Sequence, residues 1–445
     1  MKKIEVIFLA IAIPLSLCYA IFMLPLNVPD EGSHFSRAYD ISQGNIFTQI
    51  DDNGESFSLV LKEIEDDSCT RFESYEDVHK ELSKKTNYDE KVKKVCAAQA
   101  NSPLLYIGTS VAIKTCEILN INIFFALYLG RIFNVIIYLI LGYLTIRKIP
   151  FGKILMAIYL CMPMMLQQAA SCSSDSILNA TLIYYISHLI YIVFKEKEIN
   201  RKDKVILYIF TALISTFKYI YILVAGILFI KAFDKKQDKK EVIKTIIITI
   251  LIGAICSIGW FIYSTTLTSQ SEAFIEYFES ENIDTLKQIA YIKENPLHLI
   301  VTFAKEYIVY EQGYILEAVG SKLGWLNVNV NIGIIVTYII ILIIVAISEE
   351  NKYGFSNKSK IWILTIILAI SIILKMVMYI TWTPVGEGRI WGLQGRYYTP
   401  ILFLLILCLI KKDTNMKVKN LNKKMITISF VLNTLTLLTI IKNYL

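Results

Sequence analysis

Long apolar runs separated by short polar segments extend along most of the chain. Two of them, residues 246–263 and 330–347, each contain 18 successive residues without a charged side chain, and an α-helix of about 20 residues crosses a hydrocarbon core of roughly 30 Å. Backbone amides in lipid must be paired within their own segment, so each run predicts a helix. The runs lie at residues 4–26, 123–146, 154–171, 175–194, 204–217, 219–233, 242–264, 330–347, 360–380, 397–410 and 425–441. The pattern predicts an all-α polytopic membrane protein with about eleven transmembrane helices.

The charges of the polar segments predict how these helices are oriented. Basic loops stay on the cytoplasmic side of a membrane. The sequence therefore predicts one multi-pass membrane domain, 1–445, with a cytoplasmic N-terminus, a large extracytoplasmic loop at 27–102 and a second extracytoplasmic segment at 265–325. Residues 27–102 hold 16 acidic against 9 basic residues and residues 265–300 hold 6 against 2, whereas Lys and Arg cluster at residues 147–153, 195–204, 231–240, 352–360 and 411–424.

Three stretches need a separate interpretation. Residues 204–233 fit the alternation only if they cross twice, as two helices of about 14 residues that need tilt, local thinning or shielding. Residues 103–119 would reverse the charge pattern as a span, so they predict a helix on the outer surface. Residues 265–325 mix aromatic and acidic side chains, a pattern typical of amphipathic helices at the outer interface.

Composition supports the membrane class and limits the partners. The chain is 55% hydrophobic and only 19% charged, unlike an average soluble domain. Its net charge of +7 does not indicate nucleic acid, because the basic residues form short loops suited to anionic lipid. Residues 4–26 exceed the apolar core of a secretory signal. We therefore expect a retained first span, membrane lipids as partners and no nucleic acid.

The eight cysteines show no metal-ligand spacing, and six lie in or beside apolar runs, where cysteine behaves as a small hydrophobe. Cys69 and Cys96 differ, since both lie in the first long polar loop. If that loop is extracytoplasmic, the two either form a disulfide worth about 3 to 4 kcal/mol or remain apart.

The strongest local motif directly follows the first apolar run. Pro29 disfavours helix at the residue before it, so the chain leaves the membrane in a turn that presents Asp30 and Glu31. Asp30 is either the N-cap of the next helix or a site carboxylate. His34 and Arg37 follow at helical spacing, on the same face as each other, which favours a functional cluster.

A second polar constellation precedes the last pair of apolar runs. A glycine-flanked pair of arginines is suited to a phosphate or diphosphate at the membrane surface. The alternative is that Arg396 extends toward lipid phosphates as a helix-end residue. The candidate binding residues of this constellation are Glu387, Arg389, Gln394, Arg396 and Tyr397.

Two further polar residues fall on the same side in this topology. Asp175 is either the N-cap of the helix that follows or a site carboxylate, and Lys218 separates the two short runs of 204–233, where its charge would be costly. Lys375 lies inside a run and either extends to the interface or pairs with a carboxylate. Phosphate-binding glycine loops and zinc-binding His pairs are missing from the sequence.

The Pro-Asp-Glu motif at 29–31 and the Gln-Gly-Arg-Tyr motif at 394–397 together resemble a family of bacterial membrane proteins, domain of unknown function 2142. The resemblance covers about residues 4–409 and includes Asp175 and Lys218. That family is similar to the C-fold (GT-C) glycosyltransferases, which use polyprenyl-phosphate sugar donors. The resemblance implies an active face outside the plasma membrane, on which Asp30 or Glu31 acts as general base on a glycan or other envelope acceptor.

The same resemblance implies that Arg396, helped by Arg389 and Lys218, stabilises the leaving lipid phosphate. A divalent cation held by carboxylates is the alternative, and the sequence leaves the metal open. The leading hypothesis is an inverting glycosyltransferase. The alternatives are a transporter or flippase of lipid-linked envelope precursors, with Asp175 and Lys375 in its path, and a non-catalytic envelope assembly subunit that would tolerate loss of Asp30.

Overall fold

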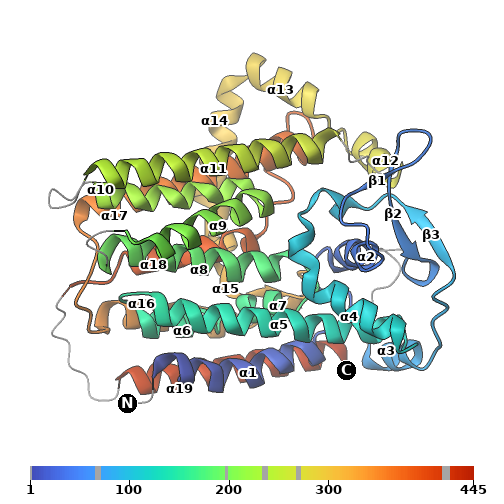
Figure 1. Ribbon diagram of the computed structural model, residues 1–445, viewed down its shortest axis with the longest axis horizontal. Helices are drawn as coiled ribbons and strands as arrows, with labels where there is room; N and C mark the ends of the chain where they lie inside the picture. Colours follow the sequence, from blue (N-terminus) through green and yellow to red (C-terminus); the bar gives the residue numbers. More distant parts are fainter. Residues whose placement is uncertain (1–2, 66–71, 196–198, 233–238, 267–271, 413–420) are drawn as a thin grey trace.

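The computed structural model is a bundle of roughly parallel helices with a small mixed lobe at one end and a helical arm standing off one side (Figure 1). It describes residues 3–65, 72–195, 199–232, 239–266, 272–412 and 421–445. Among these residues, six helices are long and apolar enough to cross a membrane, which fits the predicted class. They are α1 Ile4–Phe22, α5 Ile123–Lys148, α8 Ser174–Lys195, α11 Lys239–Thr266, α17 Asn357–Thr381 and α19 Leu421–Tyr444.

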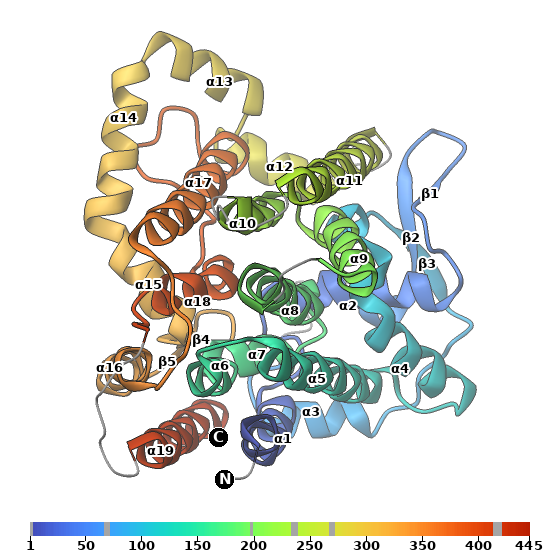
Figure 2. The same ribbon diagram turned by 60° about the vertical axis from the view of Figure 1, so that its left-hand side comes forward.

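Helix α8 lies at the centre of the bundle and α11 at its periphery (Figure 2). The most apolar stretch of α8 is 83% buried, whereas that of α11 is only 22% buried. Along α11 the exposed side chains include Ile247, Leu251, Ile255 and Ile258. A continuous apolar stripe of this kind is rare on a protein surrounded by water, so α11 has the surface expected of a lipid-facing helix.

Two predicted spans are shorter or interrupted. Residues 154–171 form α6 Lys153–Tyr159 and α7 Pro163–Ala169 rather than one helix, because Pro163 forces Met162 out of the helical region (ψ 144°). Residues 397–410 contribute only α18 Thr399–Leu407, after the short 3₁₀ helix η6 Gly395–Tyr397. Most side chains of both stretches are buried in the bundle, although Leu405 and Leu409 of the second are exposed, so protein surrounds most of their length.

The stretch 204–233 divides at Lys218, as the polar break in the pattern predicts. Before it runs α9 Arg201–Phe217, and after it the 3₁₀ helix η4 Tyr219–Leu228 continues into α10 Phe229–Ala232. A 3₁₀ helix rises about 2.0 Å per residue against about 1.5 Å in an α-helix. These 14 residues therefore span about 26 Å instead of about 21 Å, which reduces the mismatch with a bilayer.

The segment that follows α1 folds into the mixed lobe. An antiparallel sheet in the order β1-β2-β3 lies against α2, and α4 packs beside both α2 and α5. The elements are α2 Glu31–Ser42, β1 Gln49–Ile50, β2 Ser56–Leu61, η1 Lys62–Ile64, α3 Tyr75–Leu82, β3 Lys91–Lys94, η2 Ala97–Ala100, η3 Pro103–Tyr106 and α4 Ile107–Ile118.

The segment between α11 and α16 forms the arm and then returns to the bundle. Helices α13 and α14 arch away from it (Figure 2), and α14 continues through a π-helical turn into α15, which packs against η6. The elements are α12 Glu272–Ser280, α13 Thr285–Glu294, α14 Pro296–Lys305, η5 Glu306–Tyr310, α15 Glu311–Val319, β4 Lys322–Leu323, β5 Val328–Asn329 and α16 Ile332–Ser348.

The described parts of the lysine-rich segments, among them residues 147–153 and 352–360, lie at the end of the bundle opposite the mixed lobe (Figure 1). At that end, Lys148 forms an ion pair with Asp203 (2.5 Å), and the amide of Gly152 donates to the side chain of Asn351 (2.9 Å). Turns that are far apart in sequence thus meet at one end, as an alternating bundle requires.

Candidate functional site

Two predicted site residues from opposite ends of the chain form an ion pair. The Asp30 carboxylate accepts a hydrogen bond from Nη2 of Arg396 at 2.6 Å. The Asp30 side chain is 50% exposed and that of Arg396 only 5%. Asp175, at the start of α8, approaches the same guanidinium at 3.4 Å. One buried cation therefore holds two carboxylates, one of which faces outward.

The backbone before α2 directs Asp30 toward this arginine. Asp30 occupies the N-cap position in the left-handed region (φ 62°), and its side chain makes no capping hydrogen bond. Residues other than glycine adopt this conformation rarely, although Asp tolerates it. The carbonyl of Pro29 accepts a second bond from Arg396 at 3.3 Å. The carboxylate is thus committed to Arg396 and not to helix capping.

Gly395 allows Arg396 to lie against α15. A Cβ atom at this position would stand 2.5 Å from the carbonyl oxygen of Tyr314 and 2.6 Å from the amide of Ala318. The amide of Gly395 also donates to the Glu317 carboxylate at 3.2 Å. Any side chain at 395 would push η6, and Arg396 with it, away from this surface.

Lys218 brings a second cation to the site. Its ammonium lies 4.1 Å from the centre of the Tyr397 ring, within the range of a cation–π contact. The Tyr221 hydroxyl donates to the Tyr397 carbonyl at 2.7 Å and ties η4 to η6. Lys218 and Tyr397 thus join the cluster around Arg396, as the sequence predicts.

His34 borders the same cluster in a neutral form. Its Nδ1 lies 2.7 Å from the hydroxyl of Tyr106, and burial lowers the pKa of the imidazole more than the charge of Asp30 raises it. Partial burial raises the pKa of the Asp30 carboxyl, but the charge of Arg396, its hydrogen bond to the carboxylate and the charge of Lys218 hold that pKa below its usual value. Asp30 is therefore ionised at neutral pH.

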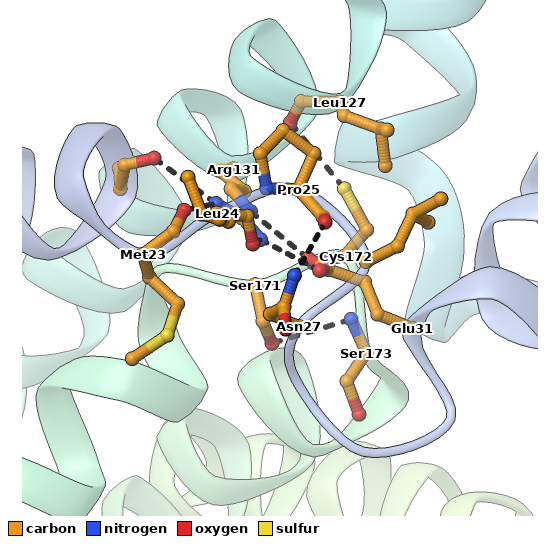
Figure 3. A network of polar contacts seen from close by, with 12 residues as sticks. Met23, Leu24, Pro25, Asn27, Glu31, Leu127, Arg131, Ser171, Cys172 and Ser173 are labelled. Atoms are coloured by element: carbon orange, nitrogen blue, oxygen red, sulfur yellow. Dashed lines mark hydrogen bonds and ion pairs between the residues drawn. The ribbon is translucent and has the colours of Figure 1, made fainter. Parts of the chain in front are cut away.

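Glu31, the other predicted catalytic carboxylate, points into the protein and pairs with Arg131 (Figure 3). Two bonds of 2.9 and 2.6 Å join them, and neither side chain is exposed. The amide of Cys172 donates to the same carboxylate at 2.9 Å. Glu31 thus links α2 to α5 and to the turn before α8, and it has no open face toward a substrate.

Arg131 is a polar centre that the sequence interpretation missed. Its guanidinium also donates to the carbonyls of Ala20, Met23 and Leu24, which lie in the last turn of α1 and directly after it, where the helix no longer supplies amide donors. The signal was present, because a charged residue inside an apolar run has a partner by necessity. Its partner comes from a residue 100 positions away, which no local pattern reveals.

Three predicted site residues point elsewhere. Arg37 pairs with Asp40 (2.9 Å) and donates to loop carbonyls, so it fixes the lobe. Arg389 lies 4.6 Å from the centre of the Tyr310 ring, and Glu387 is exposed. Arg389 thus contacts Tyr310 of η5, and a joint role of Arg389 and Arg396 in binding a phosphate stays a prediction.

Two further sequence predictions concern cysteine and buried charge. Cys69 lies outside the described residues, so its pairing with Cys96 stays a prediction; the thiol of Cys96 donates to the carbonyl of Ser33 at 3.1 Å. Lys375, unplaced by the sequence, forms an ion pair with Glu311 and lies 3.7 Å from the centre of the Tyr307 ring. Of its two open alternatives, pairing with a carboxylate is the observed one.

Carboxylates are also metal ligands, and the site contains two of them, Asp30 and Asp175. Within the part of the chain that the structure describes, no three His, Cys, Asp or Glu side chains come together as a metal-binding group. Asp30 and Asp175 would supply two oxygen ligands, but both already neutralise Arg396. The residues present therefore fit an anion-binding centre better than a cation-binding one.

The fold and the cluster define a polytopic helical membrane protein with an ion-paired site at one end of its bundle. The chain belongs to the predicted membrane protein family DUF2142, whose model matches residues 15–405. Comparison with curated proteins gave no match, and neither did comparison with solved structures.

Proposed function

We propose that this protein is an inverting glycosyltransferase that takes a sugar from a polyprenyl-phosphate donor and passes it to a cell-envelope acceptor. The observation that carries the proposal is the half-exposed Asp30 carboxylate 2.6 Å from the buried guanidinium of Arg396. A base and an anion-binding group side by side are what displacement of a lipid phosphate by a hydroxyl needs.

The charge balance of the cluster supports a phosphate ligand that competes with Asp30. Arg396 and Lys218 carry two positive charges against the negative charges of Asp30 and Asp175. A phosphate oxygen that binds Arg396 takes the place of the exposed carboxylate rather than the more buried Asp175. Asp30 then loses the contacts that lower its pKa, and its basicity rises as the donor binds.

The reaction follows from these positions. Asp30 accepts the proton of the acceptor hydroxyl, whose oxygen forms a bond to the anomeric carbon as the bond from that carbon to the phosphate oxygen breaks. The electron pair leaves with the lipid phosphate. Arg396 stabilises the added negative charge, and the Lys218 ammonium, beside the Tyr397 ring, contributes to the same stabilisation. A single displacement inverts the anomeric centre. Glu31 positions Asp30 through Arg131 and touches no substrate.

The membrane orientation belongs to the same proposal. The described parts of the lysine-rich segments lie at the end of the bundle opposite the mixed lobe (Figure 1), and lysine-rich loops stay in the cytoplasm. In the proposed topology the N-terminus is cytoplasmic and the chain crosses the membrane eleven times. The site then lies on the extracytoplasmic side of the plasma membrane. Acceptor glycans and the heads of lipid-linked donors meet at that surface.

The test is sugar transfer by the purified protein in lipid vesicles that contain polyprenyl-phosphate donors. Asp30→Asn and Arg396→Lys are expected to lower the rate at least 100-fold, because each removes a group that acts on the transition state. Glu76→Gln, an exposed carboxylate of α3 (76% exposed), is the matched control and keeps the wild-type rate. Unchanged transfer by both site variants would exclude this mechanism.

The buried pair of Lys375 and Glu311 favours a second candidate function, transport of a lipid-linked precursor. Ion pairs inside a membrane are costly and often line a transport path. A transporter moves the labelled lipid across vesicles without forming product, and it depends on Lys375 rather than on Asp30. The same vesicles distinguish the two functions through Lys375→Met, which abolishes movement of the lipid in one case and leaves transfer in the other.

A further inference from the structure

A narrow pocket lies behind Arg396, beside the ion pair with Asp30. Its walls come from the turn before α2, from α7, from α15, from the β4–β5 hairpin and from η6, and Pro29, Gln168, Glu317, Gln394 and Arg396 are among its lining residues. The empty space between these walls is about 210 Å³, part of which is open to solvent. Its enclosed part is about the size of one water molecule, so it receives a hydroxyl group but not a whole sugar ring.

Three residues that line this pocket carry buried polar atoms without a hydrogen-bond partner among the described residues. Gln168 is 1% exposed, and its Oε1 has no partner among the described residues. Its Nε2 has only a weak contact of 3.5 Å to the sulfur of Met164. Within the same described part of the chain, Oε1 of Gln394 and Nε of Arg396 are likewise buried without a partner. Buried polar atoms without partners are uncommon in folded proteins.

The neighbouring residue Gln167 differs from Gln168 because its side-chain oxygen is hydrogen-bonded within the protein. It is as buried as Gln168, but its Oε1 accepts a bond from the amide of Gly324 at 2.7 Å, which fixes the β4–β5 hairpin. Within the described part of the chain, Oε1 of Gln168 and Oε1 of Gln394 accept no such bond. These two amide oxygens are therefore the atoms left for a ligand.

We infer that this pocket is a sugar subsite, in which Gln168 and Gln394 bind one hydroxyl-bearing arm of the sugar whose phosphate lies on Arg396. The inference rests on the proposed function and names the part of the donor that the protein recognises. A neutral hydroxyl suits the site, because it donates to an amide oxygen and accepts from Nε of Arg396 with one group. An apolar or acidic arm would leave the two amide oxygens unpaired.

The test measures binding and transfer separately. The probes are citronellyl phosphate and citronellyl-phosphate donors of glucose, galactose, mannose and arabinose, each with its series of single-deoxy analogues. Wild-type protein is expected to bind at least one sugar donor tenfold or more tightly than citronellyl phosphate, and to lose that preference when one particular hydroxyl is missing. A site built to pair a hydroxyl rejects the analogue that lacks it.

The variants separate a ligand role from a structural one. Gln168→Leu is expected to remove the preference for the hydroxyl while the protein keeps or gains thermal stability, because an unpaired buried amide is lost. Gln168→Asn restores part of the preference. Gln167→Leu, the matched control, lowers thermal stability through the lost hairpin contact.

Each outcome decides the inference. It is overturned if no sugar donor binds better than citronellyl phosphate, if Gln168→Leu keeps the hydroxyl preference, or if Gln168→Leu loses as much stability as Gln167→Leu. Sugar-dependent binding that requires Gln168, without transfer to any acceptor, would support the subsite and contradict the transferase. Transfer without sugar-dependent binding would do the reverse.

Discussion

Replacing Glu31 by Gln tests whether this residue positions the site or performs chemistry. The substitution keeps the shape of the side chain but leaves the Arg131 guanidinium, with no exposed surface, facing no negative charge. Breaking a buried pair by removing one partner costs about 3 to 5 kcal/mol. A folded protein has only about 5 to 15 kcal/mol of net stability, so the loss is a large fraction of the total.

Replacing both Glu31 and Arg131 measures the interaction free energy between the two side chains. Arg131→Leu leaves the Glu31 charge unpaired and also removes the arginine hydrogen bonds to three carbonyls in and directly after the last turn of α1, so it costs at least as much as Glu31→Gln. Changing both residues to Leu removes both charges together. Because the two single changes share one interaction, the double variant is expected to lose less stability than their sum.

Equilibrium unfolding of the purified protein in mild detergent, followed by tryptophan fluorescence as a denaturing detergent is added, measures these losses. The control is Glu241→Gln, which breaks the partly exposed pair of Lys204 and Glu241 and is expected to cost less than about 1 kcal/mol. The reasoning is refuted if Glu31→Gln is no more destabilising than this control, or if the double variant loses the full sum.

Three further predictions address the rest of the molecule. Gly395→Ala is expected to cost about 1 to 3 kcal/mol by overpacking against α15 and to lower transfer, measured by unfolding and in vesicles; wild-type values for both would contradict the contact. Burial raises the pKa of Glu349 to about 7, so the folded state binds the extra proton between about pH 4.5 and 7, and stability falls by about 3 kcal/mol as pH rises through that range. Unfolding at several pH values checks this, since Glu349→Gln should remove that part of the slope. Membrane-impermeant maleimide should label Asn87→Cys from outside intact cells and Lys202→Cys only after the membrane is opened, and the opposite result would reverse the orientation.

Only part of the site could be predicted from the sequence. Asp30, Asp175, Lys218, Arg396 and Tyr397 were each selected from local polarity at the ends of apolar runs, and the structure brings them together. The reason is that an alternating topology places every second turn at the same end of a bundle. A correct order of crossings therefore predicts which turns meet, without any knowledge of side-chain contacts.

The same reasoning could not separate adjacent residues. Asp30 and Glu31 are equivalent in the sequence, yet one is half exposed and the other fully buried. The left-handed backbone at Asp30 turns the two side chains in different directions, and Arg131 then determines which of them stays inside. The partner lies on another helix, so only packing could assign the two roles.

The apolar pattern by itself determined the membrane class, the positions of most helices and the end of the bundle where polar residues gather, because the cost of placing charge and unpaired backbone in lipid acts on each segment separately. Only the tertiary structure decided that 154–171 is two helices, that η4 extends as a 3₁₀ helix, and that Arg37 pairs with Asp40. It also revealed the pocket beside Gln168. These features depend on distances between side chains from remote segments, and those distances are set by packing rather than by the period of any one run.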